Sequence, residues 1–216
     1  MTSPDRTERR RLVVATRSAH KLHELRELLD LPRARLLSLD DLGVDGEPVE
    51  DGLTFESNAA KKARWAARAT GLAALADDSG IEVDALHGGP GVRTRRYAGE
   101  DATDDDNNRK LLAALTGLAP EQRGARYVCV LALALPSAAG PRGGLKVTTR
   151  RGITRGRIAL EPRGSAGFGY DPIFEPVSEP PGGRTFGLWP PEAKNAISHR
   201  GRAARRMASV LRELAL

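Results

Sequence analysis

Apolar and polar positions along the chain fall into segments with two different periods. Short apolar runs predict buried strands at 11–16 (RLVVAT), 35–39 (RLLSL) and 125–135 (ARYVCVLALAL). Two further runs, 72–76 and 81–86, flank the tetrapeptide DDSG and predict two strands joined by a turn. The stretch 145–160 predicts another strand pair, which turns around Gly152.

Helix-like segments separate these strands. A stripe of leucines predicts a helix at 21–29, and a threonine cap, an alanine-rich body and a closing glycine predict one at 54–71. Thr103, followed three residues later by Asp106, predicts the start of a helix at 103–117. Core spacing predicts a last helix through Met207, Val210, Leu211 and Leu214. This alternation predicts an α/β protein with a mixed sheet.

The composition is that of an ordinary soluble protein. Of 216 residues, 40% are apolar and 29% are charged. The longest apolar run, 128–135, is far shorter than the ~20 residues that a membrane span needs, and no apolar segment follows the charged N-terminus. The single cysteine, Cys129, excludes an internal disulfide and any zinc site with several cysteines. We therefore expect a cytoplasmic protein without a membrane partner.

The net charge of +6 raises the question of nucleic acid as a partner. The basic residues, however, are spread along the chain, and the few aromatic residues do not interleave with the basic clusters as a stacking platform requires. We expect no nucleic-acid partner. Binding of a phosphorylated small molecule explains the excess of basic over acidic residues equally well.

Two adjacent carboxylates, Asp77 and Asp78, are the first candidates for chemistry. They follow the apolar run 72–76, so the prediction places them at a strand end, where α/β proteins commonly bind ligands. Oxygen ligands at such a position suit Mg²⁺, which binds through one or two carboxylates and keeps waters and substrate phosphates. Asp-Asp-Ser-Gly is also good turn chemistry, so these four residues alone leave both interpretations open.

Four other stretches carry comparable signals. The loop at 16–20 leads into a helix with Lys21 in its first turn, and a helix start of this kind binds phosphate, although no Walker A motif is present. Asn58 and Lys62 lie one turn apart on a helix that follows Glu50. The glycine-rich stretch 164–174 contains aromatic residues that could stack on a base, and 194–201 places basic residues around a helix break.

Five motifs together resemble the inosine triphosphate pyrophosphatase family, which hydrolyses non-canonical purine nucleoside triphosphates. They are GLTFESNAAKKA, ADDSGIEVDAL, GGPGVRTRRYAGEDATDDDN, GFGYDPIF and KNAISHRG, in the order and spacing of that family. The resemblance covers Leu12 to about Leu211. It implies a single domain at 12–216, with 1–11 as a flexible tail. The implied fold is an elongated mixed sheet flanked by helices, with a substrate cleft between two lobes.

The resemblance also implies an activity. Members hydrolyse inosine, deoxyinosine and xanthosine triphosphates (ITP, dITP, XTP) to the monophosphate and pyrophosphate, with Mg²⁺ as cofactor. They are usually homodimers, and we expect the same here. A protein that only binds nucleotides remains an alternative, although the retained Glu50 and Asp78 speak against a decayed site. Another nucleotide phosphohydrolase with a different base choice is the second alternative.

The resemblance further implies a role for each residue that matches a family motif. Asp78 is implied as proton acceptor and metal ligand, Glu50 as the second metal ligand, and Asp77, Asn58 and Lys62 as supporting residues. The sequence leaves open how Asp77 and Asp78 divide the base and ligand roles. The residues implied to bind substrate are Thr16, Arg17, Ser18, Ala19, His20, Lys21, Ser79, Phe168, Gly169, Tyr170, Asp171, Lys194, His199 and Arg200.

Some positions depart from the family pattern. Arg17 and Ser18 stand where glycine and asparagine are usual, so Arg17 either constrains the loop or adds a phosphate contact. His20, His23 and His87 have no metal-ligand spacing, and surface or packing roles are expected for them. The acidic run 104–106 lies in the first turn of a predicted helix, where it favours the helix dipole, and we expect a structural role for it.

Overall fold

A six-stranded mixed sheet forms the centre of the computed structural model, which describes residues 10–136 and 144–214. The strand order is β2-β1-β3-β4-β5-β6, with β1 parallel to β2 and β3 and with antiparallel pairing from β3 to β6. The strands are β1 (Arg10–Val14), β2 (Ala34–Ser38), β3 (Ala73–Val83), β4 (Gly124–Leu135), β5 (Lys146–Ile158) and β6 (Phe174–Pro176).

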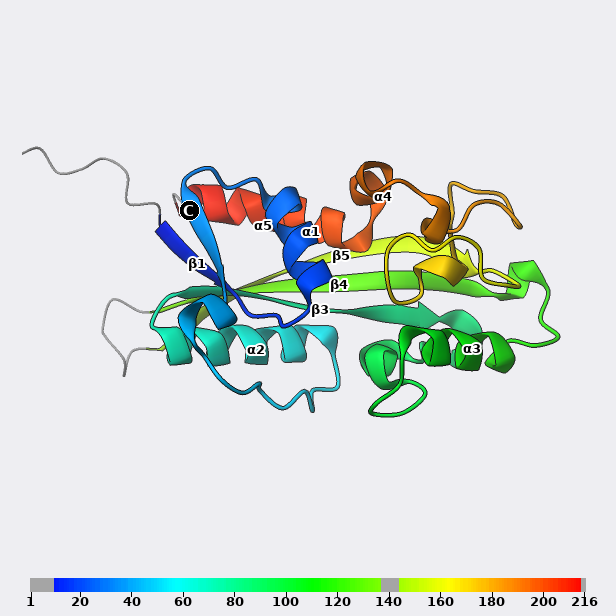
Figure 1. Ribbon diagram of the computed structural model, residues 1–216, viewed down its shortest axis with the longest axis horizontal. Helices are drawn as coiled ribbons and strands as arrows, with labels where there is room; N and C mark the ends of the chain where they lie inside the picture. Colours follow the sequence, from blue (N-terminus) through cyan, green and yellow to red (C-terminus); the bar gives the residue numbers. More distant parts are fainter. Residues whose placement is uncertain (1–9, 137–143, 215–216) are drawn as a thin grey trace, which may run out of the picture.

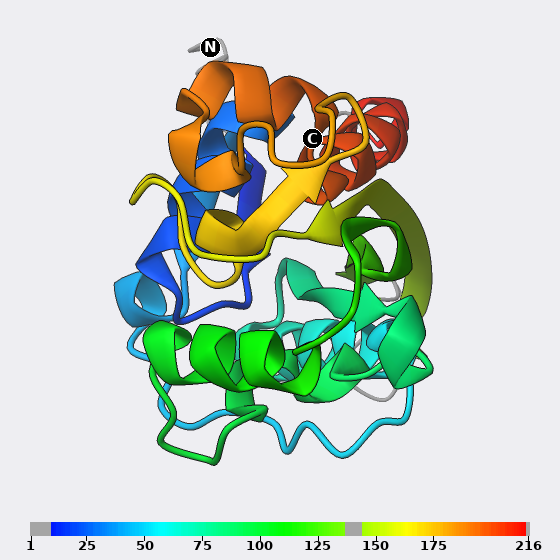
Figure 2. The same ribbon diagram turned by 90° about the vertical axis from the view of Figure 1, so that its right-hand side faces the viewer.

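Helices cover both faces of this sheet. They are α1 (Ala19–Leu29), α2 (Phe55–Thr70), α3 (Asp104–Ala114), α4 (Pro191–Ile197) and α5 (His199–Glu213). Helices α1 and α5 lie on one face and α2 on the other, and the long strands β4 and β5 give the molecule its elongated shape (Figure 1). Seen along the sheet, α3 lies on the face opposite α4 and α5 (Figure 2). The predicted mixed α/β fold is confirmed, and the division into two lobes stays a prediction.

Side-chain alternation along β3 sends neighbouring residues into different cores. Leu75 packs with residues of α1 and α5, whereas Ala74 and Ala76 pack with the alanine face of α2. A third apolar cluster, which includes Ile81 and Phe174, fills the far end of the sheet. Two adjacent residues of β3 therefore always face two different layers of helices.

Helix α2 begins and ends where its sequence predicts. Thr54 accepts a hydrogen bond from the backbone N–H of Ser57, the Ser57 side chain bonds back to Thr54, and Gly71 ends the helix in the left-handed conformation. Small alanines let this helix pack closely on β3 and β4. The predicted break before the last helix is also confirmed, because Ser198 separates α4 from α5 and caps α5.

The predicted turn at DDSG is wrong, because β3 runs through it without interruption. Asp77, Asp78, Ser79 and Gly80 pair with residues 128–131 of β4, so a long-range ladder overrides the local turn preference. Gly80 serves close packing instead. A Cβ at this position would lie 2.5 Å from Thr94 Oγ1 and 2.6 Å from a backbone oxygen.

The strand pair predicted around Gly152 is likewise wrong, since β5 is one continuous strand paired with β4 along its length. Gly152 lets helix α5 approach the sheet: a Cβ there would lie 2.1 Å from the His199 carbonyl oxygen and 2.5 Å from the Ala203 nitrogen.

Both ends of the described chain lie side by side. The guanidinium of Arg10, the first residue of β1, donates to the Leu214 carbonyl at 3.0 Å. Strand β1 thus begins within the segment 1–11 that was expected to be a tail, and residues 1–9 lie outside the described residues. No helix in the described ranges is long and apolar enough to cross a membrane.

Substituting Gly152→Ala should destabilise the protein. The added methyl group collides with the backbone of α5, and such overpacking costs about 1–3 kcal/mol of unfolding free energy. Urea denaturation measures the loss. Gly144→Ala is the matched control, because its Cβ meets no atom of the described residues within 4 Å and should change stability by less than ~0.5 kcal/mol. Equal midpoints for the two variants would contradict the packing argument.

Candidate active site

A cavity of about 620 Å³ collects nearly all the residues that the sequence implied as functional. Its wall comes from the β1–α1 loop, β3, α2, the 3-10 helix η3 (Gly91–Arg96), the start of α3, the segment 168–171, and the α4–α5 junction. Every implied site residue lines it except Asn58. The structure therefore brings together segments that are far apart in the sequence.

The cavity exists because β1 is shorter than its neighbour β3. The last β1 residue, Val14, pairs with Leu75, and the Ala15 N–H donates to the Leu75 carbonyl at 2.7 Å. Beyond this point one edge of β3 has no strand beside it in the described structure, and Asp77 and Asp78 follow immediately. They point to opposite faces of the sheet, yet both reach the cavity at this open edge.

On the α2 face, Asp78 meets Lys62. The Lys62 ammonium lies 2.8 Å from Asp78 Oδ1 and 3.3 Å from Glu50 Oε1. Asn58 supports this arrangement from one turn earlier, because its Oδ1 accepts from the Gly52 N–H at 2.8 Å and holds the segment after Glu50. Burial raises the pKa of Asp78, and Lys62 offsets the rise only in part. Among the described residues, the buried Oδ2 of Asp78 has no hydrogen-bond partner.

On the other face, Asp77 is fully engaged by cations. Lys21 lies 2.5 Å from its Oδ1, Arg200 Nε lies 3.3 Å from its Oδ2, and the Cys129 thiol is 3.3 Å from the same oxygen. Burial alone would raise the pKa of Asp77, but Lys21, Arg200 and Lys62 outweigh it and hold that pKa well below its usual range. The two adjacent aspartates are thus electrostatically different groups.

Arg200 continues the ion-pair network through the protein interior. Its side chain is 2% exposed, and it donates to Glu24 at 2.5 Å and to Ser79 Oγ at 3.0 Å. Glu24 also accepts from Lys194 at 3.2 Å, and Lys194 lies 2.7 Å from Asp171. Burial would raise the pKa of Glu24, but Arg200 and Lys194 outweigh it and keep the pKa below its usual value.

Sequence reasoning missed Glu24. Its position one turn after Lys21 on α1 was the available signal, since residues three apart share a helix face. The leucine stripe drew attention to the neighbouring positions instead.

Aromatic rings form the opposite side of the cavity. Phe168 stacks on His20 with ring centroids 5.4 Å apart, and the Lys194 ammonium lies 5.1 Å from the Phe168 centroid. His199 stacks on Tyr127 at 4.5 Å. Burial, with Arg200 and Lys194 adding to it, lowers the pKa of His199 well below its usual value, so the ring is neutral. His20 lines the cavity and contacts an aromatic ring, in agreement with its implied place.

The segment 168–171 is tied to α3 and η3. Asp104 Oδ2 accepts from the Gly169 N–H at 2.6 Å, Asn108 donates to the Gly169 carbonyl at 3.0 Å, and the Tyr170 hydroxyl donates to the Thr94 carbonyl at 2.8 Å. A purely helix-dipole role for the run 104–106 is therefore too narrow. Asp106 forms the capping box with Thr103 as expected, whereas Asp104 lines the cavity and orients its aromatic wall.

The carboxylates suit Mg²⁺ better than a transition metal. In the described part of the chain, no group of three or more His, Cys, Asp or Glu side chains has the geometry to hold a metal ion. Mg²⁺ needs only one or two carboxylates when water and phosphate oxygens complete its shell. Glu50 and Asp78 fit that requirement, and the unpartnered Asp78 Oδ2 is an available acceptor.

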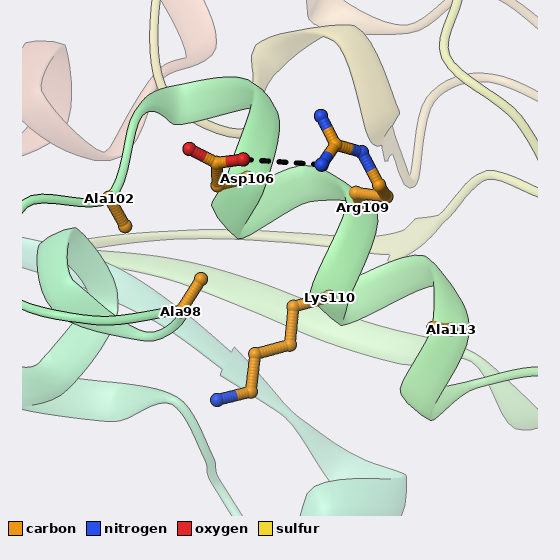
Figure 3. Close-up of a pocket in the computed structure, with 6 residues that line it drawn as sticks. All are labelled: Ala98, Ala102, Asp106, Arg109, Lys110 and Ala113. Carbon is orange, nitrogen blue, oxygen red and sulfur yellow. Dashed lines mark hydrogen bonds and ion pairs between the residues drawn. The ribbon is translucent and has the colours of Figure 1, made fainter.

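A second depression, of about 400 Å³, lies on α3 (Figure 3). Three alanines line it, and its charged side chains are already paired: Asp106 with Arg109 at 3.2 Å, and Lys110 with the Tyr97 carbonyl at 2.6 Å. It lacks the convergent polar groups of a binding site, and we assign the chemistry to the larger cavity.

Comparison with known proteins decides the family. The model of the Ham1 family matches residues 12–210. The chain belongs to the Ham1 family. This confirms the resemblance drawn from the five sequence motifs.

Relatives of this Ham1-family chain are similar over nearly their full length. A dITP/XTP pyrophosphatase of Geobacter sulfurreducens is 52% identical over 89% of the chain and 92% of its own length, and one of Nocardia farcinica is 46% identical over 95% and 96%. The solved structure of a HAM1 protein from Coxiella burnetii superposes with a TM-score of 0.82 at 42% identity, over 94% of this chain and 99% of that one.

Arg200→Gln should destabilise the Ham1-family chain strongly. The substitution leaves Asp77 and Glu24 buried with one cation fewer, and breaking a buried ionic network costs about 3–5 kcal/mol. The drop in the urea midpoint measures it. Arg202→Gln, two residues further along α5, is the control. Because Arg202 is exposed, its loss should cost less than ~1 kcal/mol of unfolding free energy. A small effect at Arg200 would show that the network contributes little to stability.

Acid should destabilise the protein through His199. The unfolded chain protonates this ring near pH ~6.5, whereas the native state keeps it neutral. Above that pH, His199 does not lower the unfolding free energy. Below that pH, the unfolding free energy falls by at most ~1.4 kcal/mol for each pH unit because the unfolded state binds the proton. His199→Gln should flatten the slope between pH 7 and pH 5 in urea denaturation. The exposed His23 supplies the control His23→Gln, which should keep the wild-type slope.

Proposed function

We propose that this Ham1-family chain hydrolyses dITP, XTP and ITP to the nucleoside monophosphate and pyrophosphate, with Mg²⁺ as cofactor. One observation carries the proposal: an open strand edge presents two carboxylates, Asp77 and Asp78, to a cavity that also contains buried cations and an aromatic platform. The relatives named dITP/XTP pyrophosphatase, at 46–52% identity over almost the whole chain, support it.

The β1–α1 loop would bind the triphosphate. Ser18 caps α1, so the free backbone N–H groups of the first turn point toward the cavity with the positive end of the helix dipole. Lys21 and Lys62 add two positive charges close by. Electrostatic positioning of this kind supplies most of the catalysis of phosphoryl transfer.

Asp78 would accept the proton of the attacking water. Asp78 lines the cavity, and its buried Oδ2 has neither a hydrogen bond nor an ion pair among the described residues, whereas Oδ1 and Oδ2 of Asp77 form ion pairs with Lys21 and Arg200. Glu50 and Asp78 would hold Mg²⁺, which when bound offsets the negative charge of the triphosphate. Asp77 keeps Lys21 and Arg200 in place beneath the substrate. Attack at the α-phosphorus then releases pyrophosphate.

The aromatic wall would bind the base. Phe168 lines the cavity together with His199 and Arg200; the neutral His199 ring can donate or accept a hydrogen bond, whereas the Arg200 guanidinium only donates. A 6-oxo purine accepts a hydrogen bond where adenine donates one, so a buried donor left unpaired by adenine could discriminate by up to ~10⁴. This is the physical basis for preferring inosine and xanthosine over adenosine. We also expect a homodimer, as the family resemblance implied, and sedimentation of the purified protein tests it.

The purified protein should release pyrophosphate from dITP, XTP and ITP in the presence of Mg²⁺, and far less from ATP. Asp78→Asn should lower kcat by roughly 10² to 10⁴, since it removes the proton acceptor without changing the side-chain shape. Pyrophosphate and orthophosphate are assayed separately. Asp105→Asn, the same chemical change at an exposed position of α3, is the matched control.

Three results would contradict the proposal. Orthophosphate as the first product would move the attack to the γ-phosphorus. Equal turnover of ATP and ITP would show that the enzyme has a different base preference. Tight ITP binding without turnover would favour a protein that binds nucleotides and does not hydrolyse them.

A further inference from the structure

The guanidinium of Arg17 bridges two loops that both line the cavity. Arg17 belongs to the β1–α1 loop, and its ion pair with Asp40 reaches the 3-10 helix η1 (Asp40–Leu42). Its Nη2 donates to the Val44 carbonyl at 2.8 Å and to the Gly46 carbonyl at 3.1 Å, and its Nε lies 3.6 Å from Glu47 Oε1. Four contacts therefore fix one side chain.

The segment that Arg17 contacts also contains Glu50. Residues 43–54 connect η1 to α2 without regular secondary structure. The later half is fixed from two sides, because Asn58 binds Gly52 and Arg96 donates to the Glu50 carbonyl at 3.1 Å. Within the described residues, all hydrogen bonds and ion pairs of 45–49 come from Arg17.

Both loops face the cavity. Arg17 lines it together with Glu47, Pro48 and Glu50, so the contacts of Arg17 lie in the cavity wall. Arginine suits the task because its planar fork can serve two carbonyls and two carboxylates at once, which a lysine cannot. Two turns with glycine in the left-handed region, at Gly43 and Gly46, shape the segment that presents the carbonyls of Val44 and Gly46 to it.

We propose that Arg17 is a positioning residue that fastens the Glu50 segment to the β1–α1 loop, and that it is not a phosphate ligand. The inference rests on the proposed function in one respect, because it takes Glu50 as part of the metal site. With its donors committed to Asp40, Val44 and Gly46, the guanidinium holds Glu50 at a fixed distance from the loop that binds phosphate. Loss of the bridge leaves 45–49 without a hydrogen bond or ion pair among the described residues, so that only Lys62 and Arg96 then hold Glu50 directly.

Hydrogen exchange of the free protein, without metal or nucleotide, tests the fastening directly. Within 43–49 the described N–H groups that donate a hydrogen bond are those of Gly43 and Val44, to the carbonyls of Asp40 and Leu39, and Arg17→Ala should speed their exchange while leaving 54–70 unchanged. Asp40→Asn should give the same pattern more weakly, and Arg17→Lys should be intermediate. Arg68→Ala, an equal loss of charge at an exposed position near the far end of α2, is the control and should exchange like the wild type. Unchanged exchange of 43–49 in Arg17→Ala would overturn the proposal.

Kinetics then separate positioning from phosphate binding. As a positioning residue, Arg17→Ala should raise the half-saturating Mg²⁺ concentration and lower kcat by about tenfold, because small misplacements of catalytic groups are costly. The Asp40→Asn, Arg17→Ala double variant should be no worse than Arg17→Ala alone. If Arg17 were a phosphate ligand, Arg17→Ala would instead raise KM for nucleotide and weaken inhibition by pyrophosphate. Asp40→Asn, which frees the guanidinium, would then strengthen the binding of both nucleotide and pyrophosphate. That result would overturn the proposal.

Failure of the proposed function is distinguishable from failure of this inference. A wild-type protein that makes no pyrophosphate refutes the function, whereas the exchange pattern of 43–49 still decides whether Arg17 fastens the segment. Melting temperatures of all variants, measured alongside, identify any that are globally unfolded; in that case Asp40→Asn alone decides the exchange result.

Discussion

A buried guanidinium holds this fold and its cavity together. Arg200 lies at the start of α5, and its three nitrogens reach a carboxylate on β3, a carboxylate on α1 and the Ser79 hydroxyl. Removing a charge from water costs several kcal/mol unless partners surround it closely. Arg200 therefore requires β3, α1 and α5 to be in one arrangement, and that arrangement is the one in which the cavity exists. The ion pairs that hold these elements together are also the ones that place charged groups at the cavity.

A simple geometric rule explains how two identical neighbours obtain different roles. Consecutive strand residues point to opposite faces, so Asp77 meets the layer of α1 and α5 while Asp78 meets α2. Only the early end of β1 allows both to reach one cavity. Without that open edge, one carboxylate would be buried in each layer with no access to substrate. The length of a neighbouring strand is thus as important for the site as the acidic residues themselves.

Local signals in the sequence predicted local structure well. Helix α2 was placed from its threonine cap and closing glycine, because those contacts lie within the helix. The turn at DDSG and the break at Gly152 failed since pairing with β4, which is distant in sequence, overrides turn preference. Motifs located the residues around the cavity, but Glu24 and Asp104 were missed because their partners are 176 and 65 residues away. Apart from the helix face that Glu24 shares with Lys21, no local pattern indicates such contacts.

Arg200 follows both of its carboxylate partners in the sequence, and this bears on the order in which the network can form during synthesis. Helix α5 is the last helix that the structure describes, and it brings the cation that neutralises Asp77 and Glu24. A nascent chain emerging from the ribosome carries β3 and α1 long before this cation is available. Asp77 and Glu24 therefore lack this shared partner until α5 docks. A nascent chain that ends before Arg200 therefore contains Asp77 and Glu24 but not the guanidinium that joins them.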